Sequence, residues 1–189
     1  MSADAIEGSL LDALLAVHDV LEAEGVEHAL CGGLAANLYR DELRTTIDID
    51  LYLVSSAPQL VSLARAFEER GWTAHPAWRQ AELLRLERDD LPRVDLLIAS
   101  TDFERDAVQH ASRALIAGRD IRVLTPEDLI VFKLVAGRLR DYEDVAAVLN
   151  ARGGEIDIRY VRRWLEEFGM SDRWQRALDE ARREAQDLG

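Results

Sequence analysis

The segment that most constrains the fold of this chain is residues 46–53, in which polar and apolar side chains alternate. The apolar set is Ile47, Ile49, Leu51 and Leu53, and the polar set is Thr46, Asp48, Asp50 and Tyr52. A period of two is typical of a β-strand with one apolar face, so the segment predicts a strand lying on a hydrophobic core. Asp48 and Asp50 then project from the other face, about 7 Å apart along the strand.

Two carboxylates held this close on a rigid strand repel each other, and a divalent cation relieves the repulsion. Oxygen ligands suit Mg²⁺, which keeps several waters and adds substrate phosphates to its shell, so we expect Mg²⁺, with Mn²⁺ as the alternative. The pair Gly32-Gly33 lies upstream and offers a bare backbone turn that phosphates can approach closely. Each feature alone has an ordinary explanation, as a turn or as a chance triplet in a chain with 36 Asp and Glu residues. Their combination indicates a functional site.

The glycine pair, a short helical segment at 34–39 and the pattern Arg44-x-Thr46-x-Asp48-x-Asp50 together resemble the DNA polymerase β-like nucleotidyltransferase superfamily. The pattern is most similar to the abortive-infection and toxin–antitoxin (AbiEii-type) branch, and the resemblance covers about residues 10–150. It implies an α/β core with a mixed sheet flanked by helices, followed by C-terminal helices. It also implies metal-dependent transfer of an NMP from an NTP to an acceptor hydroxyl, with release of pyrophosphate.

The resemblance also assigns roles to single residues. Asp48 and Asp50 would hold the metal, and Gly32 and Gly33 would bind the nucleotide. Thr46 is assigned to nucleotide binding because it shares the polar face with these acids.

Arg44 shares that polar face, and two roles are open for it. It either contacts phosphate or neutralises Asp48 and Asp50.

A third carboxylate, Asp95, stands inside the apolar run at residues 93–98. The resemblance places a third acid about here, as a metal ligand that helps deprotonate the acceptor hydroxyl. The alternative is a strand-end aspartate paired with Arg93 or Arg85.

Lys133 is the only lysine among 23 basic residues, and it stands in a helix that is apolar on nearly every side. An unpaired ammonium there would cost several kcal/mol, so it must reach solvent, pair with a carboxylate or meet an anion. The resemblance implies contact with the nucleotide triphosphate, as part of the catalytic set. The alternative is a structural pair with Asp141 or Asp144.

The remaining sequence predicts the elements on either side of the site. We expect helices at about 9–24, 58–70, 102–111, 125–138, 140–151, 157–168 and 171–187, and strands at 26–31, 46–54, 72–74, 81–87, 93–99 and 121–124. Residues 1–124 would form the α/β core and 125–189 a helical section packed on it, or the two would be one continuous domain. The tryptophans are expected to pack, with stacking on a base as the alternative for Trp78.

Composition limits the partners. A net charge of −13 argues against a broad nucleic-acid surface and favours a small-molecule or protein acceptor. No apolar run reaches about 18 residues, so no membrane span is expected. The acidic N-terminus without a secretory pattern and the single cysteine, Cys31, predict a cytoplasmic protein. No His/Cys spacing indicates zinc.

The acceptor stays open at this point. The resemblance offers a tRNA 3′ end, a partner protein or a small molecule such as an antibiotic, and a toxin role would add a cognate antitoxin. The alternative of a different class is a non-catalytic nucleotide- or partner-binding protein with the same fold.

Overall fold

The computed structural model describes residues 8–75 and 83–187, which form two compact units. The sheet unit comprises the chain up to Leu34 together with Thr45–Leu124. The helical unit comprises Ala35–Arg44 and the chain from Thr125 onward. These units differ from the division expected at residue 124 in that residues 35–44 group with the later helices.

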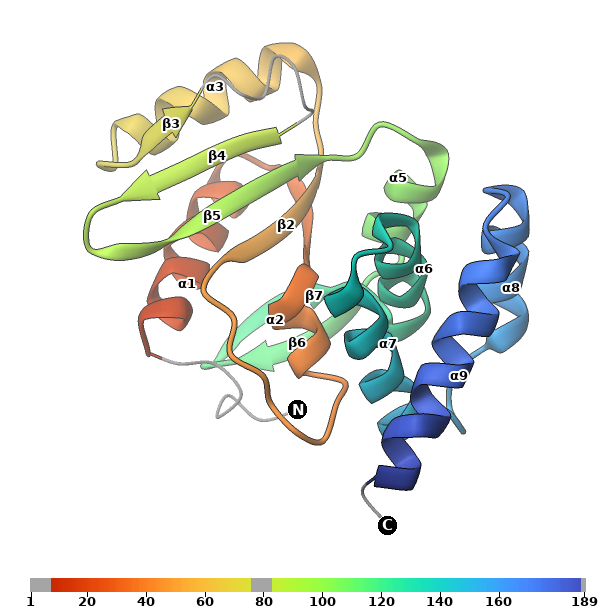
Figure 1. Cartoon of the computed structure of the whole chain (residues 1–189). Coiled ribbons are helices and arrows are strands. Elements are labelled where there is room, and N and C mark those ends of the chain that lie inside the picture. The colour runs from red at the N-terminus through yellow and green to blue at the C-terminus, as the bar shows by residue number, and fades with distance from the viewer. Residues whose placement is uncertain (1–7, 76–82, 188–189) are drawn as a thin grey trace. The chain divides into compact units, whose positions relative to one another are not determined.

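Within the described residues, seven strands form one sheet in the order β3-β4-β5-β2-β1-β7-β6 (Figure 1). Their bounds are β1 Glu27–Cys31, β2 Ile49–Val54, β3 Thr73–His75, β4 Leu83–Arg88, β5 Leu91–Ile98, β6 Ser112–Ile116 and β7 Arg119–Val123. β2 pairs in parallel with β5, β1 pairs in parallel with β7, and the other neighbours are antiparallel. The predicted mixed sheet is therefore confirmed.

The register of the central strands assigns each side chain to one of two faces. Leu51 of β2 lies beside Leu96 of β5, and both are fully buried. Asp50 lies beside Cys31 of β1 and Asp95 of β5. Because successive side chains of a strand point to opposite faces, the sheet has one leucine-rich face and one face that carries carboxylates at its centre.

Helices cover both faces of this sheet. α1 (Gly8–Ala23) lies on the leucine-rich face, since its His18 contacts His28, whose register partner on β2 is Leu53. α5 (Asp102–Gln109) lies on the carboxylate side, since its Glu104 hydrogen-bonds Tyr52, which shares that face. α3 (Ala57–Glu68) connects β2 to β3, and α2 (Gly32–Asn37) follows β1 directly.

The helical unit contains α6 (Pro126–Ala136), α7 (Leu139–Arg152), α8 (Ile158–Glu167) and α9 (Ser171–Asp187). α6 begins as predicted, with the Thr125 hydroxyl accepting a hydrogen bond from the Asp128 backbone N–H at 3.2 Å and a proline in its first turn. It ends at Gly137, whose backbone is left-handed. Arg173 of α9 donates to the carbonyl oxygens of Leu134 and Val135, which caps the last turn of α6.

Two sequence expectations need correction. The strand expected at 46–54 begins at Ile49, and Ile47 is 76% exposed. The reason is that β1 ends at Cys31, opposite Asp50, so no partner on β1 extends the ladder to residues 46–48. β6 was not expected, because this edge strand buries only Ala114 and Ile116.

Two expectations concern the rest of the chain. The suggested base-stacking residue Trp78 and the first two residues of the strand expected at 81–87 lie outside the described residues. Within the described part of the chain, no helix combines the length and the apolar character needed to cross a bilayer.

Candidate functional site

Three predicted carboxylates gather on the carboxylate face of the sheet. Asp50 and Asp95 are register partners on parallel strands, whose backbones lie about 4.8 Å apart. Asp48 immediately precedes β2 and is two residues from Asp50, which places it towards the same face. Asp95 is buried, whereas the side chain of Asp48 is one-third exposed. The three acids thus extend from the buried Asp95 to the partly exposed Asp48.

Two arginines hold these acids. Arg85 of β4 forms a bidentate pair with Asp95, with its Nε at 2.8 Å and its Nη2 at 3.0 Å from the carboxylate oxygens. Arg93 lies between two acids, with Nη2 2.8 Å from Asp48 Oδ2 and Nε 3.8 Å from Asp95 Oδ2. The predicted alternative for Asp95, an ion pair with Arg85 or Arg93, is therefore present. Because Arg93 is 41% exposed, its guanidinium can leave this cation position without opening the core.

Gly32 is required by its contact with Asp50. Its φ of +67° lies in the left-handed region, and a Cβ built on it would stand 1.9 Å from Asp50 Oδ2. The turn after β1 is therefore in direct contact with Asp50, one of the predicted metal ligands. Gly33 follows in the first turn of α2 and is buried.

Thr46 lies beside Asp48. Its hydroxyl lies 3.3 Å from the backbone oxygen and 3.5 Å from the side-chain Oδ1 of Asp48, which is a weak contact at the limit of hydrogen bonding.

The pKa of Tyr52, on the same face, is affected by the negative charge there. Burial raises the pKa of its hydroxyl, and the charges of Cys31, Glu104 and Asp50 raise it further.

In the helical unit, Lys133 pairs with two buried acids. Its Nζ lies 2.5 Å from Asp144 Oδ2 and 3.4 Å from Asp141 Oδ1. All three residues are buried. The structural pair considered as the alternative for Lys133 is present, and its role with phosphate stays a prediction.

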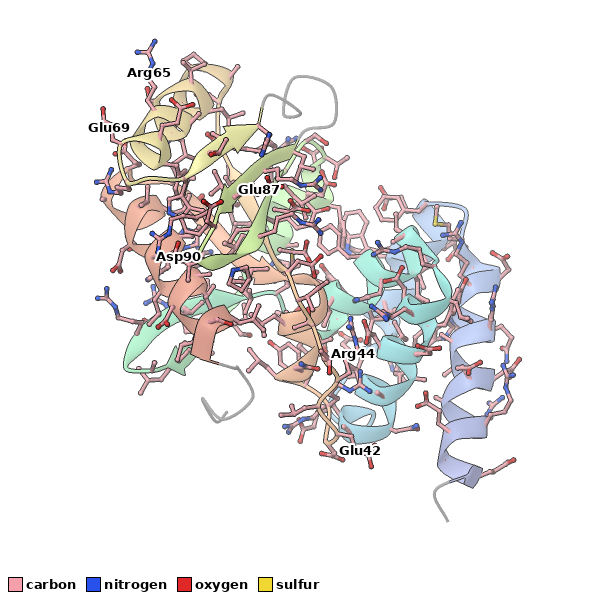
Figure 2. The ribbon with its side chains drawn as sticks, turned by 60° about the vertical axis from the view of Figure 1, so that its left-hand side comes forward. Glu42, Arg44, Arg65, Glu69, Glu87 and Asp90 are labelled. Atoms are coloured by element: carbon pink, nitrogen blue, oxygen red, sulfur yellow. The ribbon has the colours of Figure 1, made fainter. Side chains whose placement is uncertain are left out.

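Arg44 also binds Asp144, a partner that the sequence did not suggest for it. Its Nε and Nη2 donate to the two carboxylate oxygens at 2.5 and 2.8 Å, and Figure 2 shows Arg44 beside α7. Arg40 adds a third cation, with Nη1 3.0 Å from Asp144 Oδ1. Asn37 fixes the backbone of Arg44 by accepting from its N–H at 3.2 Å and donating to its carbonyl oxygen at 2.8 Å.

These contacts define a charge cluster of four cations (Arg40, Arg44, Lys133 and Arg138) around two carboxylates (Asp141 and Asp144). Four positive charges minus two negative charges leave the cluster with a net charge of +2. Burial alone would raise the pKa of Asp144, but the hydrogen bond from Arg44 and the charge of Lys133 more than offset it, so the pKa is lowered. Asp144 is therefore ionised at neutral pH.

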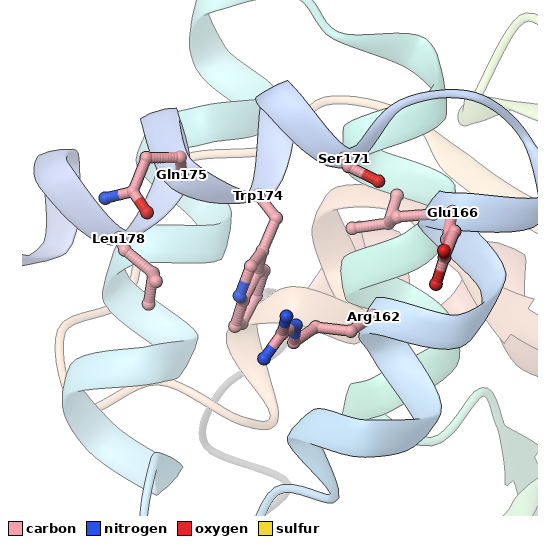
Figure 3. A pocket seen from close by; sticks show the side chains of 7 residues that line it. Arg162, Glu166, Ser171, Trp174, Gln175 and Leu178 are labelled. Carbon is pink, nitrogen blue, oxygen red and sulfur yellow. The ribbon is translucent and has the colours of Figure 1, made fainter.

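A separate pocket of about 380 Å³ lies between α8 and α9. Figure 3 shows Trp174 and Arg162 lining it, with Ser171 and Glu166 at one end. Among its lining residues Glu166 is the one carboxylate, so the pocket does not offer the acidic cluster that a divalent cation needs. No residue expected from the sequence to be functional lines it.

The sequence and the fold both match known nucleotidyltransferases. Residues 10–177 match the family model described as "Nucleotidyl transferase of unknown function (DUF2204)". No curated protein matches the sequence.

Three solved structures illustrate the similarity of fold. The lincosamide antibiotic adenylyltransferase LnuA, with lincomycin bound, is 18% identical with a TM-score of 0.55, over 72% of this chain and 94% of that chain. The antibiotic-resistance factor ANT(2'')-Ia is 17% identical with a TM-score of 0.60, over 90% of this chain and 99% of that chain. An antigenic nucleotidyltransferase-like protein from Paracoccidioides brasiliensis is 15% identical with a TM-score of 0.58, over 91% of this chain and 93% of that chain.

Replacing Gly32 should displace Asp50. We expect Gly32→Ala to lower the free energy of unfolding by about 3 kcal/mol or more, because left-handed strain adds to a clash with a carboxylate on a central strand. Gly25→Ala is the matched control, since Gly25 has a φ of +64° but a Cβ added there would meet nothing within 4 Å. That control should lose only about 1 kcal/mol. Urea unfolding followed by circular dichroism measures both, and equal losses would contradict the contact.

Removing the charge of Asp144 should leave three cations without their shared partner. We expect Asp144→Asn to lose about 3 kcal/mol of unfolding free energy at neutral pH, against little change in Glu143→Gln, an exposed neighbour on the same helix.

The same pair of proteins tests the charge state. Since the pKa of Asp144 is lowered in the folded protein, its stabilisation is complete above the unfolded value of about 3.9 and is lost as pH falls through the folded value. The difference between wild type and Asp144→Asn should therefore shrink below about pH 4. A difference that stays constant between neutral pH and pH 3 would show that charge is not its source.

Proposed function

This chain belongs to the family of nucleotidyl transferases of unknown function, and on that premise we propose that it transfers an NMP from an NTP to an acceptor hydroxyl in a Mg²⁺-dependent reaction that releases pyrophosphate. The observation that carries the proposal is the gathering of Asp48, Asp50 and Asp95 on one face of the central strands. Carboxylates in register on neighbouring strands are costly unless a cation compensates them.

The donor set fits Mg²⁺, with Mn²⁺ as the alternative. Asp48, Asp50 and Asp95 would hold the metal through hard carboxylate oxygens, and the position between Asp48 and Asp95 already accepts a cationic guanidinium, that of Arg93. When bound, the metal neutralises developing charge on the transferred phosphoryl group.

The chain's own residues would position the reactants. Arg85 holds Asp95 in one orientation through two hydrogen bonds, and Asp95 would accept the proton of the acceptor hydroxyl. Gly32 presents backbone without a side chain next to Asp50, which suits the close approach of a phosphate group. Positioning of this kind supplies a large share of the rate in phosphoryl transfer.

The net positive charge of the charge cluster supports a role in binding the triphosphate. Lys133 and Arg44 would be its phosphate-binding members, while Asp144 keeps their charged groups oriented. A compact ammonium suits a phosphate oxygen in a tight space, which agrees with a lysine standing here in a chain that otherwise uses arginine.

For the acceptor we propose a small molecule with free hydroxyl groups. The net charge of −13 disfavours a long nucleic acid, and two proteins of similar fold are an antibiotic adenylyltransferase and an antibiotic-resistance factor. A toxin with a cognate antitoxin is the second candidate, supported by the Arg44-x-Thr46-x-Asp48-x-Asp50 pattern. The acceptors to compare are lincomycin, which is bound in the LnuA structure, tobramycin, whose adenylyl derivative is bound in a structure of ANT(2'')-Ia, unfractionated tRNA and purified proteins.

The transfer itself is tested with each α-³²P-labelled NTP, Mg²⁺ and these acceptors. Asp48→Asn, Asp50→Asn and Asp95→Asn should each reduce transfer by about 100-fold or more, because each removes charge aimed at the phosphoryl group. Asp90→Asn is the control, since this exposed residue in the β4–β5 turn, labelled in Figure 2, forms its ion pair with Arg88. Full activity in Asp48→Asn would overturn the proposal. Metal-dependent NTP binding by wild type without transfer to any acceptor would favour the non-catalytic alternative.

A separate comparison tests the phosphate role of the charge cluster. If Lys133 binds the triphosphate, Lys133→Met should weaken NTP binding by about tenfold or more in calorimetric titration, as expected for one lost charged contact. Arg182→Met is the control, because Arg182 of α9 pairs with Asp179 outside the charge cluster and its side chain is 65% exposed. Lower stability of Lys133→Met with unchanged NTP affinity would assign Lys133 a structural role only.

A further inference from the structure

Two histidines that the proposed function does not use meet on the leucine-rich face of the sheet. His18 of α1 and His28 of β1 are 8% and 2% exposed. His18 Nδ1 and His28 Nε2 are 2.9 Å apart, and the rings cross at 62°. Ten residues separate the two in sequence, so their proximity follows from the packing of α1 on β1.

A carboxylate joins this pair. Glu22 is four residues after His18 on α1, so both side chains stand on the same side of the helix. One donor atom each of His18, Glu22 and His28 lie within 4.8 Å of one another. Across residues 8–75 and 83–187, this is the one group of three or more His, Cys, Asp or Glu side chains with donor atoms converging in this way.

The hydrogen bond of His28 Nδ1 determines which nitrogen of this ring can bind a metal. Its Nδ1–H donates to the Val26 carbonyl oxygen at 2.8 Å, so the Nε2 lone pair faces His18. Metal-binding histidines commonly anchor their other nitrogen on a carbonyl in this way. His18 presents its Nδ1 lone pair when its proton moves to Nε2.

We propose that His18, Glu22 and His28 bind a divalent ion of the Zn²⁺ type, with water as the fourth ligand. Two imidazoles and one carboxylate suit Zn²⁺ and Co²⁺, whereas Mg²⁺ prefers oxygen donors. Metal–nitrogen bonds of about 2.0–2.1 Å in a tetrahedral shell need the two nitrogens about 3.3 Å apart. The rings therefore separate by a few tenths of an ångström on binding.

The carboxylate of Glu22 supplies the negative charge at the site. Asp19 on α1 and Asp120 on β7 also lie near His18, but Asp19 is ion-paired with Arg119 and Asp120 with Arg113. Arg122 donates to the carbonyl oxygen of Gln109. Since the site lies on the face opposite Asp50, the ion would fasten α1 to β1 and would not enter nucleotidyl transfer.

Cobalt provides the direct test, because Co²⁺ in a four-coordinate shell with nitrogen ligands absorbs visible light far more strongly than octahedral Co²⁺ bound by oxygen. The metal-stripped full chain carrying Asp48→Asn, Asp50→Asn and Asp95→Asn is titrated with Co²⁺, so that the three proposed metal ligands of the carboxylate face do not contribute their charge. We expect one strong visible band at one equivalent, its loss on adding Zn²⁺, and a rise of a few degrees in Tm with excess Zn²⁺ but not with Mg²⁺.

Variants separate metal binding from folding. Glu22→Gln changes a surface residue and should weaken Co²⁺ binding by about tenfold or more, whereas Glu24→Gln, an exposed neighbour, should not. His28→Gln should abolish the band, and His110→Gln, at an exposed histidine, should keep it. No visible band, an octahedral spectrum, or equal affinities in Glu22→Gln and Glu24→Gln would overturn the proposal. None of these readouts depends on nucleotidyl transfer.

Discussion

The pairing of β2 between β1 and β5 is the constraint on which the candidate site depends. It fixes Asp50 opposite Asp95 on one side and next to the end of β1 on the other. Gly32 then turns the chain in the only space that Asp50 leaves, since any Cβ there would collide with the carboxylate. A shift of one residue in this register would turn the acids into the leucine-rich core, where unpaired carboxylates cannot be tolerated. Hydrophobic burial on one face therefore specifies the acidic cluster on the other.

The helical unit relies on a different interaction, the sharing of Asp144 by several cations. The carboxylate is 1% exposed, and such burial is tolerated only because Lys133, Arg44 and Arg40 supply hydrogen bonds and charge. These ion pairs also explain why residues 35–44 belong to the same compact unit as the helices that begin after Thr125, although about a hundred residues separate them in sequence. Arg40 and Arg44 are carried by that segment and are fastened to α7.

Much of the fold could be predicted, because alternation and helix caps are local signals. The strand pattern at Ile49, Leu51 and Leu53 and the Thr125-Pro126 helix start both encode their structure within a few residues. β6 was missed because an edge strand buries only one face, and few of its residues carry the signal. Asp48, Asp50 and Asp95 were found as candidates, but their arginine partners were only partly identified. Arg44 and Asp144 lie 100 residues apart, and no local pattern links them.

The histidine pair also shows that a local sequence pattern does not identify residues brought together only by folding. Metal sites are recognised in sequence when ligands recur at short fixed spacings, which one helix or one loop imposes. Here one ligand pair, His18 and Glu22, has helical spacing, but the third ligand comes from a strand that meets the helix only in the folded sheet unit. The expectation of no zinc site rested on spacing alone, so it could not address a site assembled by packing. The packing that buries the leucine-rich face also brings His18 and His28 into contact, and a metal there would reinforce the strand that leads into Gly32.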